Sequence, residues 1–396
     1  MSALLTDLQI HNFRNHDHFI IQEPRQLIII VGKNASGKTN IIEAVQLVTM
    51  LESFKNPVWS SVIRNSADKK EETTARIKAV FLQNERIIEI QMDIQEGKRE
   101  YSLNGKKRNR IDLIGLIPAI IFVPDDLMLV KSSSEVRRKL IDDIGQQLSS
   151  TYLKILNDYQ KTIKQRNAIL KNCFFEKQNQ ALLESWDENL IILGALLFTH
   201  RIRLYKRYME KACFFYQKIN SEEKFSSRYI PSFVDSEEDE SAFSNDADSR
   251  EQETKLVIMG KEEVEKRLFE RLEAVREKEK MQARSLVGPH RDDIRFYING
   301  LEARKFASQG QQRSIALALK LGQLELIREI SGNQPILLLD DVMSELDESR
   351  REALIRAIDG QIQTIITSTD LSCFNESLLK SAQIIELLRP SADDHG

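Results

Sequence analysis

Residues 27–48 read LIIIVGKNASGKTNIIEAVQLV, an apolar run followed by a glycine-bounded loop and an apolar-periodic helix. The apolar run, Leu27 to Val31, is rich in β-branched residues and does not alternate, which is typical of a strand buried on both faces of a parallel sheet. Residues 32–39 match the phosphate-binding pattern G-x-x-x-x-G-K-[ST]. Because this pattern needs a strand before it and a helix after it, and both are present, the stretch predicts a site for nucleotide phosphates.

The residue types in the loop define the expected chemistry. Successive backbone N–H groups and the positive end of the following helix would bind phosphate oxygens. Lys38 would reach the β- and γ-phosphates, and the Thr39 hydroxyl would bind Mg²⁺. The predicted nucleotide-binding residues of the loop are Gly32, Lys33, Asn34, Ala35, Ser36, Gly37, Lys38, Thr39 and Asn40.

Composition indicates a soluble globular protein. The 396 residues are 41% hydrophobic and 30% charged, and this length predicts two domains. No apolar stretch reaches the roughly eighteen residues that span a bilayer, and the N-terminus lacks a secretion signal. We therefore expect a cytoplasmic protein with no membrane partner. The unpaired spacing of the cysteines indicates reduced thiols at Cys173, Cys213 and Cys373.

Charge is unevenly distributed along the chain. The net charge is −3, but residues 235–253 hold nine acids and one base, so the rest of the chain carries +5. We interpret the acidic segment as a solvated insertion. His11, His16 and His18 form a cluster, but no Cys or carboxylate stands at ligand spacing, so a metal site is the weaker interpretation.

The N-terminal third contains antiparallel strand patterns. Five runs are predicted strands, the first two forming a hairpin that leads into the nucleotide strand: 5–10, 19–22, 74–82, 88–94 and 99–103. Asn104-Gly105 is a strong hairpin turn. This last hairpin is basic, through Lys98, Arg99, Lys106, Lys107, Arg108 and Arg110. Protection of a sheet edge and contact with nucleic-acid phosphates explain these cations equally well.

From residue 131 the pattern becomes helical. Apolar residues recur every three or four positions over 152–170, 183–197 and 264–275, which predicts antiparallel helices forming an arm. The outer faces are predicted to be basic at Lys161, Lys164, Arg166, Lys171, Arg201, Arg203, Lys206 and Arg207. A DNA backbone would fit these faces, although solvated helix surfaces are the commoner explanation.

Strand patterns return near residue 288. Residues 294–298, the turn Asn299-Gly300 and a partner strand to Lys305 predict a further hairpin. Residues 308–312, SQGQQ, open an apolar-periodic helix that continues to Leu326, and residues 361–368 predict another buried strand.

A second apolar strand, Ile336 to Leu339, ends in Asp340 and Asp341, at the strand end where ligands bind in open α/β sheets. If this strand lies beside the first, Asp340 can bind Mg²⁺ opposite Thr39, and Asp341 can position or deprotonate the attacking water. Lys38 and Asp341 are therefore the predicted catalytic residues, and Thr39 and Asp340 the predicted metal ligands. Lys38 and Asp340 are 302 residues apart, with the helical arm between them.

Six segments in this order resemble the RecF family of DNA-repair ATPases, which is related to the heads of SMC and Rad50 proteins. They are LQIHNFRNHDHF (8–19), GKNASGKTNIIEAV (32–45), FVPDDLMLVKSSSEVRRKLID (122–142), GPHRDDI (288–294), SQGQQRSIALALKLGQLELI (308–327) and PILLLDDVMSELDESRREAL (335–354). The resemblance covers nearly the whole chain.

The resemblance implies an α/β fold: an ABC-type P-loop ATPase head with a mixed sheet, an antiparallel β layer and an inserted antiparallel helical arm. The implied domains are the N-terminal part of the head (1–130), the arm with its acidic insertion near 235–253 (131–280) and the C-terminal part of the head (281–396). In SQGQQ, the family's signature residues correspond to Ser308, Gln309, Gly310 and Gln311, which would contact the γ-phosphate bound to a second subunit. Residues 344–347, SELD, resemble a loop at the dimer interface, and Arg14 and Asn15 resemble residues near the base and phosphates.

The chain departs from the family pattern in four places. Ala35 stands where the family usually has glycine. Asp125 stands where distant relatives have a nucleotide-sensing glutamine. The acidic insertion has no counterpart in the pattern, and Ser368 or Thr369 would replace the switch histidine of transporter ATPases.

The resemblance implies an ATP-dependent DNA clamp with ATP and Mg²⁺ as cofactors. ATP would favour a homodimer that grips duplex or gapped DNA, slow and DNA-stimulated hydrolysis would release it, and RecR, RecO and RecA would be partners in RecA loading and replication. The alternatives are the head of another SMC- or Rad50-like system, the ATP-binding subunit of a membrane transporter, and a small-molecule kinase. A transporter subunit predicts a shorter interval before the magnesium strand and a histidine after it, whereas the only histidine after Asp341 is His395. A kinase would leave SQGQQ without a role.

Overall fold

The computed structural model describes residues 3–55, 57–64, 74–172, 178–234, 254–358 and 362–387. The chain forms two compact units, one made of Met1–Leu127 and Gln323–Gly396 and the other of Met128–Gly322. The first boundary lies near the expected residue 130, whereas the second lies well beyond the expected residue 280. The acidic segment 235–253 and Cys173 are outside the described residues.

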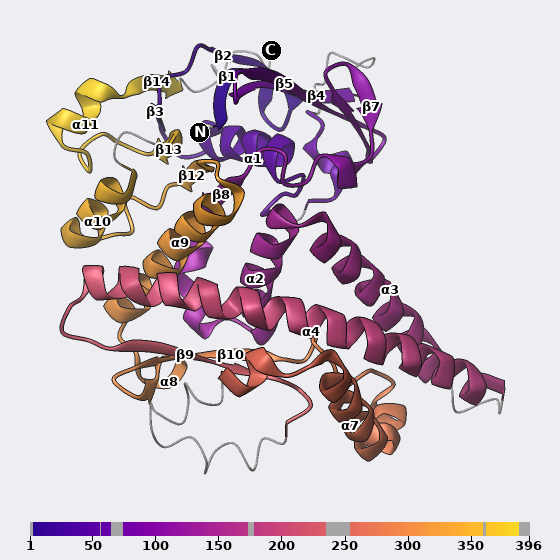
Figure 1. Ribbon diagram of the computed structural model, residues 1–396. Helices are drawn as coiled ribbons and strands as arrows, with labels where there is room; N and C mark the ends of the chain where they lie inside the picture. The colour runs from indigo at the N-terminus through magenta and orange to yellow at the C-terminus, as the bar shows by residue number, and fades with distance from the viewer. Residues whose placement is uncertain are drawn as a thin grey trace. The chain divides into compact units, whose positions relative to one another are not determined.

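A five-stranded parallel sheet forms one layer of the first unit (Figure 1). Its order is β14-β3-β13-β12-β8, with bounds Gln383–Leu387, Leu27–Gly32, Thr364–Ser368, Ile336–Asp340 and Ala119–Phe122. The central strands β12 and β13 are buried at every residue, as their unbroken apolar runs require. Direct pairing of the two site strands was wrong, because β13 hydrogen-bonds to both β3 and β12 and lies between them.

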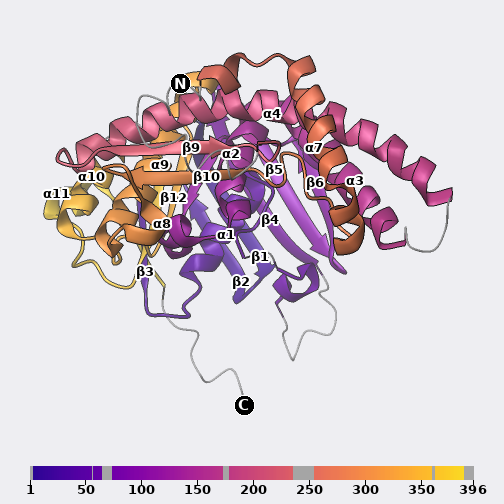
Figure 2. The same ribbon diagram turned by 90° about the horizontal axis from the view of Figure 1, so that it is seen from below.

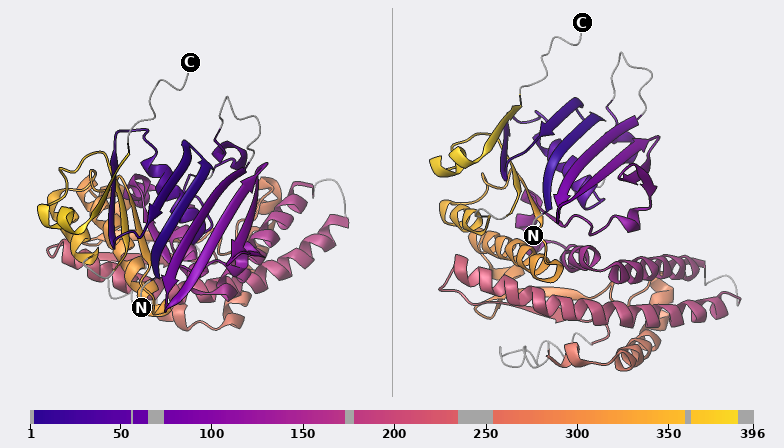
Figure 3. Two further views of the ribbon diagram at one scale, coloured as in Figure 1. Left: turned by 90° about the horizontal axis from the view of Figure 1, so that it is seen from above. Right: turned by 45° about the horizontal axis from the view of Figure 1, so that its top comes forward.

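A six-stranded antiparallel sheet forms the other layer, and Figure 3 shows its indigo-to-purple strands side by side. Its order is β2-β1-β4-β5-β6-β7, with bounds His16–Gln22, Ala3–Phe13, Thr74–Gln83, Arg86–Gln95, Lys98–Leu103 and Lys106–Arg108. The predicted antiparallel strands are confirmed, as is the Asn104-Gly105 turn between β6 and β7. Alternating residues of β4 face the core, as the period of two requires.

Helix α1, Lys38–Thr49, contacts strands of both sheets, and its apolar residues join one core cluster with theirs. Short 3₁₀ turns follow at η1, Trp59–Val62, and η2, Arg110–Asp112. Helices α10, Glu348–Ile358, and α11, Glu376–Ser381, complete the described part of this unit. The phosphate loop is thus fixed between a buried strand and a buried helix.

The second unit contains the predicted helical arm. Its helices are α2, Ser134–Leu148, α3, Ser150–Asn172, α4, Gln178–Ile219, and α7, Lys261–Gln282. The 3₁₀ segment η3, Pro124–Lys131, precedes α2 and crosses the unit boundary. Helices α3 and α4 pack together through a cluster made of Tyr152, Leu156, Tyr159, Leu190 and Leu197. These are the residues of the predicted apolar seams.

A three-stranded sheet in this unit was only partly predicted. Its order is β11-β10-β9, with bounds Leu301–Glu302, Asp293–Ile298 and Phe225–Ile230 (Figure 2). Strand β9 was missed, because it lies in a region interpreted as entirely helical, and it pairs with β10 over six residues. The partner strand expected to reach Lys305 ends at Glu302, since Ala303–Phe306 forms helix α8. This pairing keeps residues beyond 280 in the second unit.

Helix α9, Gln309–Ser331, begins in the second unit and ends in the first. Its start after Ser308 confirms the helix predicted from SQGQQ. Among the described residues, no helix is long and apolar enough to cross a membrane.

Candidate nucleotide-binding site and family

The phosphate loop connects β3 to α1 and has two residues with positive φ. Gly37 has φ 99°, and Ala35 has φ 67°, so the alanine adopts a left-handed conformation that favours glycine. The Lys38 side chain is buried against the loop, and its Nζ donates to the carbonyl oxygens of Gly32 at 2.8 Å and Lys33 at 3.2 Å. The ammonium group is therefore held inside the curve of the loop.

The remote second half of the site lies beside the loop. The Thr39 hydroxyl donates to Asp340 Oδ1 at 2.9 Å, although 301 residues separate them. Asp340 is only 5% exposed, and its Oδ1 also accepts a hydrogen bond from Thr367 Oγ1 at 2.8 Å. The two predicted metal ligands are therefore adjacent within the first unit.

Asp341 occupies a strained and partly buried position at the end of β12. Its φ is 51°, and its backbone N–H donates to Thr367 Oγ1 at 3.0 Å. Burial raises the pKa of Asp341 above its usual value, the nearby Lys38 ammonium lowers it, and the Asp340 carboxylate raises it further. Asp341 is thus a more basic carboxylate than an exposed aspartate, as a proton acceptor requires.

The site has unpaired buried oxygens that suit a ligand. Within the described part of the chain, Ser36 Oγ and Asp341 Oδ1 are buried without a hydrogen-bond partner. Buried polar atoms are nearly always paired, so both are available to bind a group from outside. Hydroxyl and carboxylate oxygens are ligands that Mg²⁺ prefers, while lysine and a helix N-terminus suit phosphates. The residues present therefore fit a magnesium nucleotide.

Thr367 is a site residue that sequence reasoning missed. Ser368 and Thr369 were the expected substitutes for the switch histidine, but the Ser368 hydroxyl donates to the Asp370 carbonyl at 2.7 Å and Thr369 is exposed. The hydroxyl that touches both Asp340 and the backbone of Asp341 belongs to Thr367. Its position near the carboxyl end of a buried strand was the available signal.

The turn between β1 and β2 lies against the same loop. Arg14 forms an ion pair at 2.7 Å with Glu43, a fully buried residue of α1. Asn15 Oδ1 accepts a hydrogen bond from Asn40 Nδ2 at 2.7 Å. Both residues predicted to lie near the nucleotide are therefore held at the phosphate loop and its helix. Asp125, whose role sequence reasoning left open, is exposed at the start of η3.

The signature segment caps α9 in the second unit. The Gln311 backbone N–H donates to Ser308 Oγ at 3.2 Å, and the Ser308 N–H donates to Gln311 Oε1 at 2.8 Å. This reciprocal pair is a capping box, in which the first turn of the helix is satisfied by side chains. Ser308 and Gln309 are exposed, whereas Gly310 and Gln311 are partly buried. Residues 344–347 form an exposed loop in the first unit, where Ser344 Oγ donates to the Asp341 carbonyl at 2.8 Å.

Comparison with known proteins places this architecture in a family. A family model described as RecF/RecN/SMC N terminal domain matches residues 4–387. The DNA replication and repair protein RecF of Picosynechococcus sp. is 35% identical over 96% of this chain and 94% of its own length. The protein of the same name from Shouchella clausii is 34% identical over 96% of each chain. The chain belongs to the RecF family.

Solved structures agree with this assignment. The structure of the recombination mediator protein RecF-ATP in the RecFOR pathway superposes with a TM-score of 0.82 at 29% identity, covering 94% of both chains. The Smc head domain from Pyrococcus furiosus, solved with the C-terminal domain of ScpA, has a TM-score of 0.51 at 16% identity over 97% of this chain and 93% of its own, and shows the fold alone. The predicted fold class, an ABC-type head with an inserted helical arm, is confirmed.

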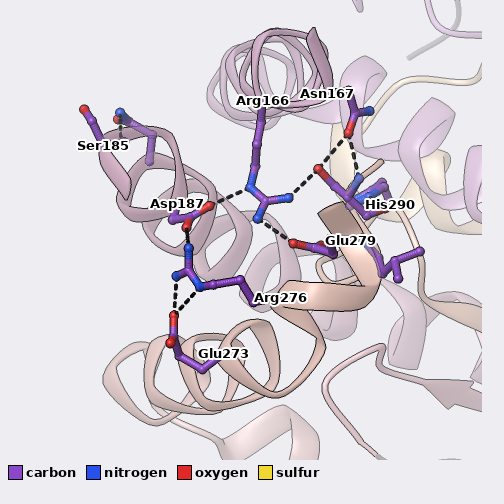
Figure 4. Close-up of polar contacts among 11 residues, drawn as sticks. Arg166, Asn167, Ser185, Asp187, Glu273, Arg276, Glu279 and His290 are labelled. Carbon is purple, nitrogen blue, oxygen red and sulfur yellow. Dashed lines mark hydrogen bonds and ion pairs between the residues drawn. The ribbon is translucent and has the colours of Figure 1, made fainter. Parts of the chain in front are cut away.

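Two of the predicted basic positions on the arm of this RecF-family chain are not on its outer face. Arg166 is fully buried and binds Asp187 Oδ1 and Glu279 Oε2 at 2.6 Å each, and Ser285 Oγ at 2.8 Å (Figure 4). Arg201 is 2% exposed and binds both carboxylate oxygens of Asp142. The prediction was wrong for these two because a spacing pattern does not reveal charged partners on other helices. The other cations of that set are exposed or half-buried: Lys161, Lys164, Lys171, Arg203, Lys206 and Arg207.

The basic hairpin distributes its cations over two faces of the sheet. Arg108 lies opposite the buried Tyr101, whereas its neighbour Lys107 forms an ion pair with Glu100 at 2.6 Å. The Arg99 guanidinium lies 4.2 Å from the centre of the Trp59 ring. Because side chains alternate along a strand, consecutive cations of β7 point to opposite faces. The structure leaves both explanations of this edge open.

Proposed function

We propose that this chain is an ATPase that binds ATP and Mg²⁺ at the site of Lys38, Thr39, Asp340 and Asp341. The observation that carries the proposal is the 2.9 Å hydrogen bond from Thr39 to Asp340, which joins the phosphate loop to the second site strand. Membership of the RecF family and the RecF-ATP structure, 29% identical to this chain, support the nucleotide as ATP. Hydrolysis then requires a base and charge neutralisation at the phosphates, and these residue types supply both.

Each residue has a distinct role in this proposal. The N–H groups of the loop and the Lys38 ammonium bind and orient the β- and γ-phosphates. Thr39 and Asp340 would hold Mg²⁺, which when bound neutralises phosphate charge and orients the oxygens around it. Asp341 positions the attacking water and accepts its proton, for which its raised pKa is suited. Thr367 orients Asp340 through its hydroxyl.

We further propose that a second copy of the chain completes the site. The exposed Ser308 and Gln309 stand at the N-terminus of α9, where a helix favours anions. Bound to the γ-phosphate on the partner, they would make ATP favour the dimer, because ATP would bind that state more tightly. The dimer would clamp duplex or gapped DNA, with hydrolysis as the release step. RecR, RecO and RecA are the proposed partners, because related structures are described as recombination mediators of the RecFOR pathway.

The test compares two lysines of the same loop. Lys38→Ala removes the ammonium that faces the phosphates, whereas Lys33→Ala changes an exposed lysine of the loop and keeps its backbone N–H. A fluorescent N-methylanthraniloyl ATP with magnesium should bind the wild type and Lys33→Ala alike, and light scattering with ATP should show dimers of both. Lys38→Ala should bind and dimerise far more weakly. Equal ATP-dependent dimerisation of Lys38→Ala would contradict the proposal.

A further inference from the structure

Three consecutive residues of the β1–β2 turn reach the phosphate loop or the first turns of α1. Arg14 binds Glu43 and Asn15 binds Asn40, as described above. The third residue is His16, whose Nε2 lies 3.1 Å from the carbonyl oxygen of Gly37. His16 was considered in the sequence only as a metal ligand, and its contact with the loop was not predicted.

Gly37 is confined on the side that faces this turn. A Cβ atom at this position would lie 2.5 Å from Asn15 Nδ2 and 2.6 Å from His16 Nε2. The φ of 99° also disfavours any L side chain. The turn therefore packs directly on the backbone of the loop, and glycine is required for close approach as well as for conformation.

The Gly37 carbonyl is the first acceptor of helix α1. It accepts hydrogen bonds from the backbone N–H groups of Asn40 at 2.9 Å and Ile41 at 3.2 Å. The contact with His16 adds a donor from outside the helix. Since the C=O of Gly37 and the N–H of Lys38 belong to one planar trans peptide, fixing the carbonyl also fixes the direction of that N–H.

The surroundings of His16 favour the neutral ring with the proton on Nε2. Burial lowers the pKa of His16 most, the Gly37 carbonyl raises it, and the Arg64 charge lowers it further. Arg64 is itself paired with Asp17 at 3.3 Å, and the Phe19 ring lies 5.5 Å from the imidazole. In this tautomer Nε2–H donates to the carbonyl, which is the role that the geometry requires.

We infer that His16 is a positioning residue of the nucleotide site, which orients the Lys38 N–H toward the phosphates by donating to the Gly37 carbonyl. The inference rests on the proposed binding of ATP. It makes the β1–β2 turn part of the phosphate-binding apparatus, because the turn holds the last peptide of the loop in the orientation that the ligand needs. Preorganised donors bind an anion more tightly than donors that must first be ordered.

The test uses the full-length chain and fluorescent N-methylanthraniloyl ATP with magnesium. His16→Leu and His16→Phe both remove the N–H donor, and His16→Gln keeps one. Losing one net hydrogen bond should raise the Kd of the first two variants about fivefold, while His16→Gln stays close to the wild type. His18→Leu is the matched control, because His18 is exposed on the same strand and its ring pairs with His11.

Melting temperatures without nucleotide separate positioning from a purely structural role. A structural role would lower the melting temperature of the Leu and Phe variants and leave their Kd unchanged, which would overturn the inference. A loss in His16→Gln as large as in His16→Leu would overturn the donor role. If the wild type itself bound no nucleotide, the proposed function would fail instead of this inference.

Discussion

The backbone at Gly37 shows how closely single residues control the phosphate loop. Two requirements coincide there, the positive φ and the space taken by Asn15 and His16. At Gly105, in the β6–β7 turn, only the first applies, because φ is 74° and no atom lies within 4 Å of a built Cβ. The two glycines therefore separate conformational strain from steric exclusion.

We expect Gly105→Ala to lower the free energy of unfolding by about 1–2 kcal/mol, the cost of a left-handed alanine. Gly37→Ala should cost more than this, because the new methyl must displace the turn, and it should also abolish binding of fluorescent ATP. Urea unfolding and nucleotide titration of both variants measure the difference. Equal costs in the two variants would show that packing of the turn on the loop contributes nothing.

His290 supplies a pH prediction in the second unit. Its ring lies between the Tyr159 hydroxyl, 2.7 Å from Nδ1, and the Ser285 carbonyl, 3.3 Å from Nε2. Burial lowers the pKa of His290 to about 3, with smaller contributions from the charges of Arg291, Arg138 and Arg166. The unfolded state, with a pKa of about 6.5, therefore binds more protons between these two values.

Stability from neutral His290 should accordingly be lost as pH falls from about 6.5 toward 3, with a slope of at most about 1.4 kcal/mol per pH unit. His290→Gln removes the titrating ring, so its stability should depend less steeply on pH. Urea unfolding at pH 7, 6, 5 and 4 tests this. Parallel pH curves for the two proteins would contradict the buried neutral imidazole.

Among the elements, the arm helices depend on one buried ion network. Arg166 of α3 joins Asp187 of α4 and Glu279 of α7, and Arg276 of α7 binds Asp187 at 3.1 Å (Figure 4). Three helices thus meet at charges that water cannot reach. Removing one partner of such a network leaves buried charge uncompensated.

Arg166→Met should therefore lower the free energy of unfolding by about 3–5 kcal/mol. Lys164→Met, on an exposed position of the same helix, should change it by less than about 0.5 kcal/mol. Chemical unfolding followed by circular dichroism compares them. A loss below 1 kcal/mol in Arg166→Met would mean, by the same reasoning about buried charge, that solvent reaches the network.

At the scale of the whole molecule, local patterns predicted most elements and distant partners did not follow from them. The apolar runs of β3 and β12 and the alternation of β4 and β5 are properties of short segments, so they could be read directly. The position of β13 between the two site strands depends on pairing across the sheet. The burial of Arg166 depends on carboxylates from two other helices, and a periodic pattern contains no information about them.

The candidate site divides in the same way. Lys38 and Thr39 belong to a contiguous motif, and Asp340 stands at a predictable strand end. Thr367 and His16 enter the site only because folding brings their donors to Asp340 and Gly37. Contacts of this kind carry no spacing signal in the sequence.

Completion of the nucleotide site by a second copy is the central claim, and Ser308→Arg tests it most directly. The substitution places a bulky cation on the exposed signature and leaves the residues of the phosphate loop unchanged. We predict that this variant binds fluorescent ATP as a monomer but stays monomeric by light scattering with ATP and magnesium, while the wild type doubles in mass. An ATP-dependent dimer of Ser308→Arg that forms at the same protein concentration as the wild type would contradict the account.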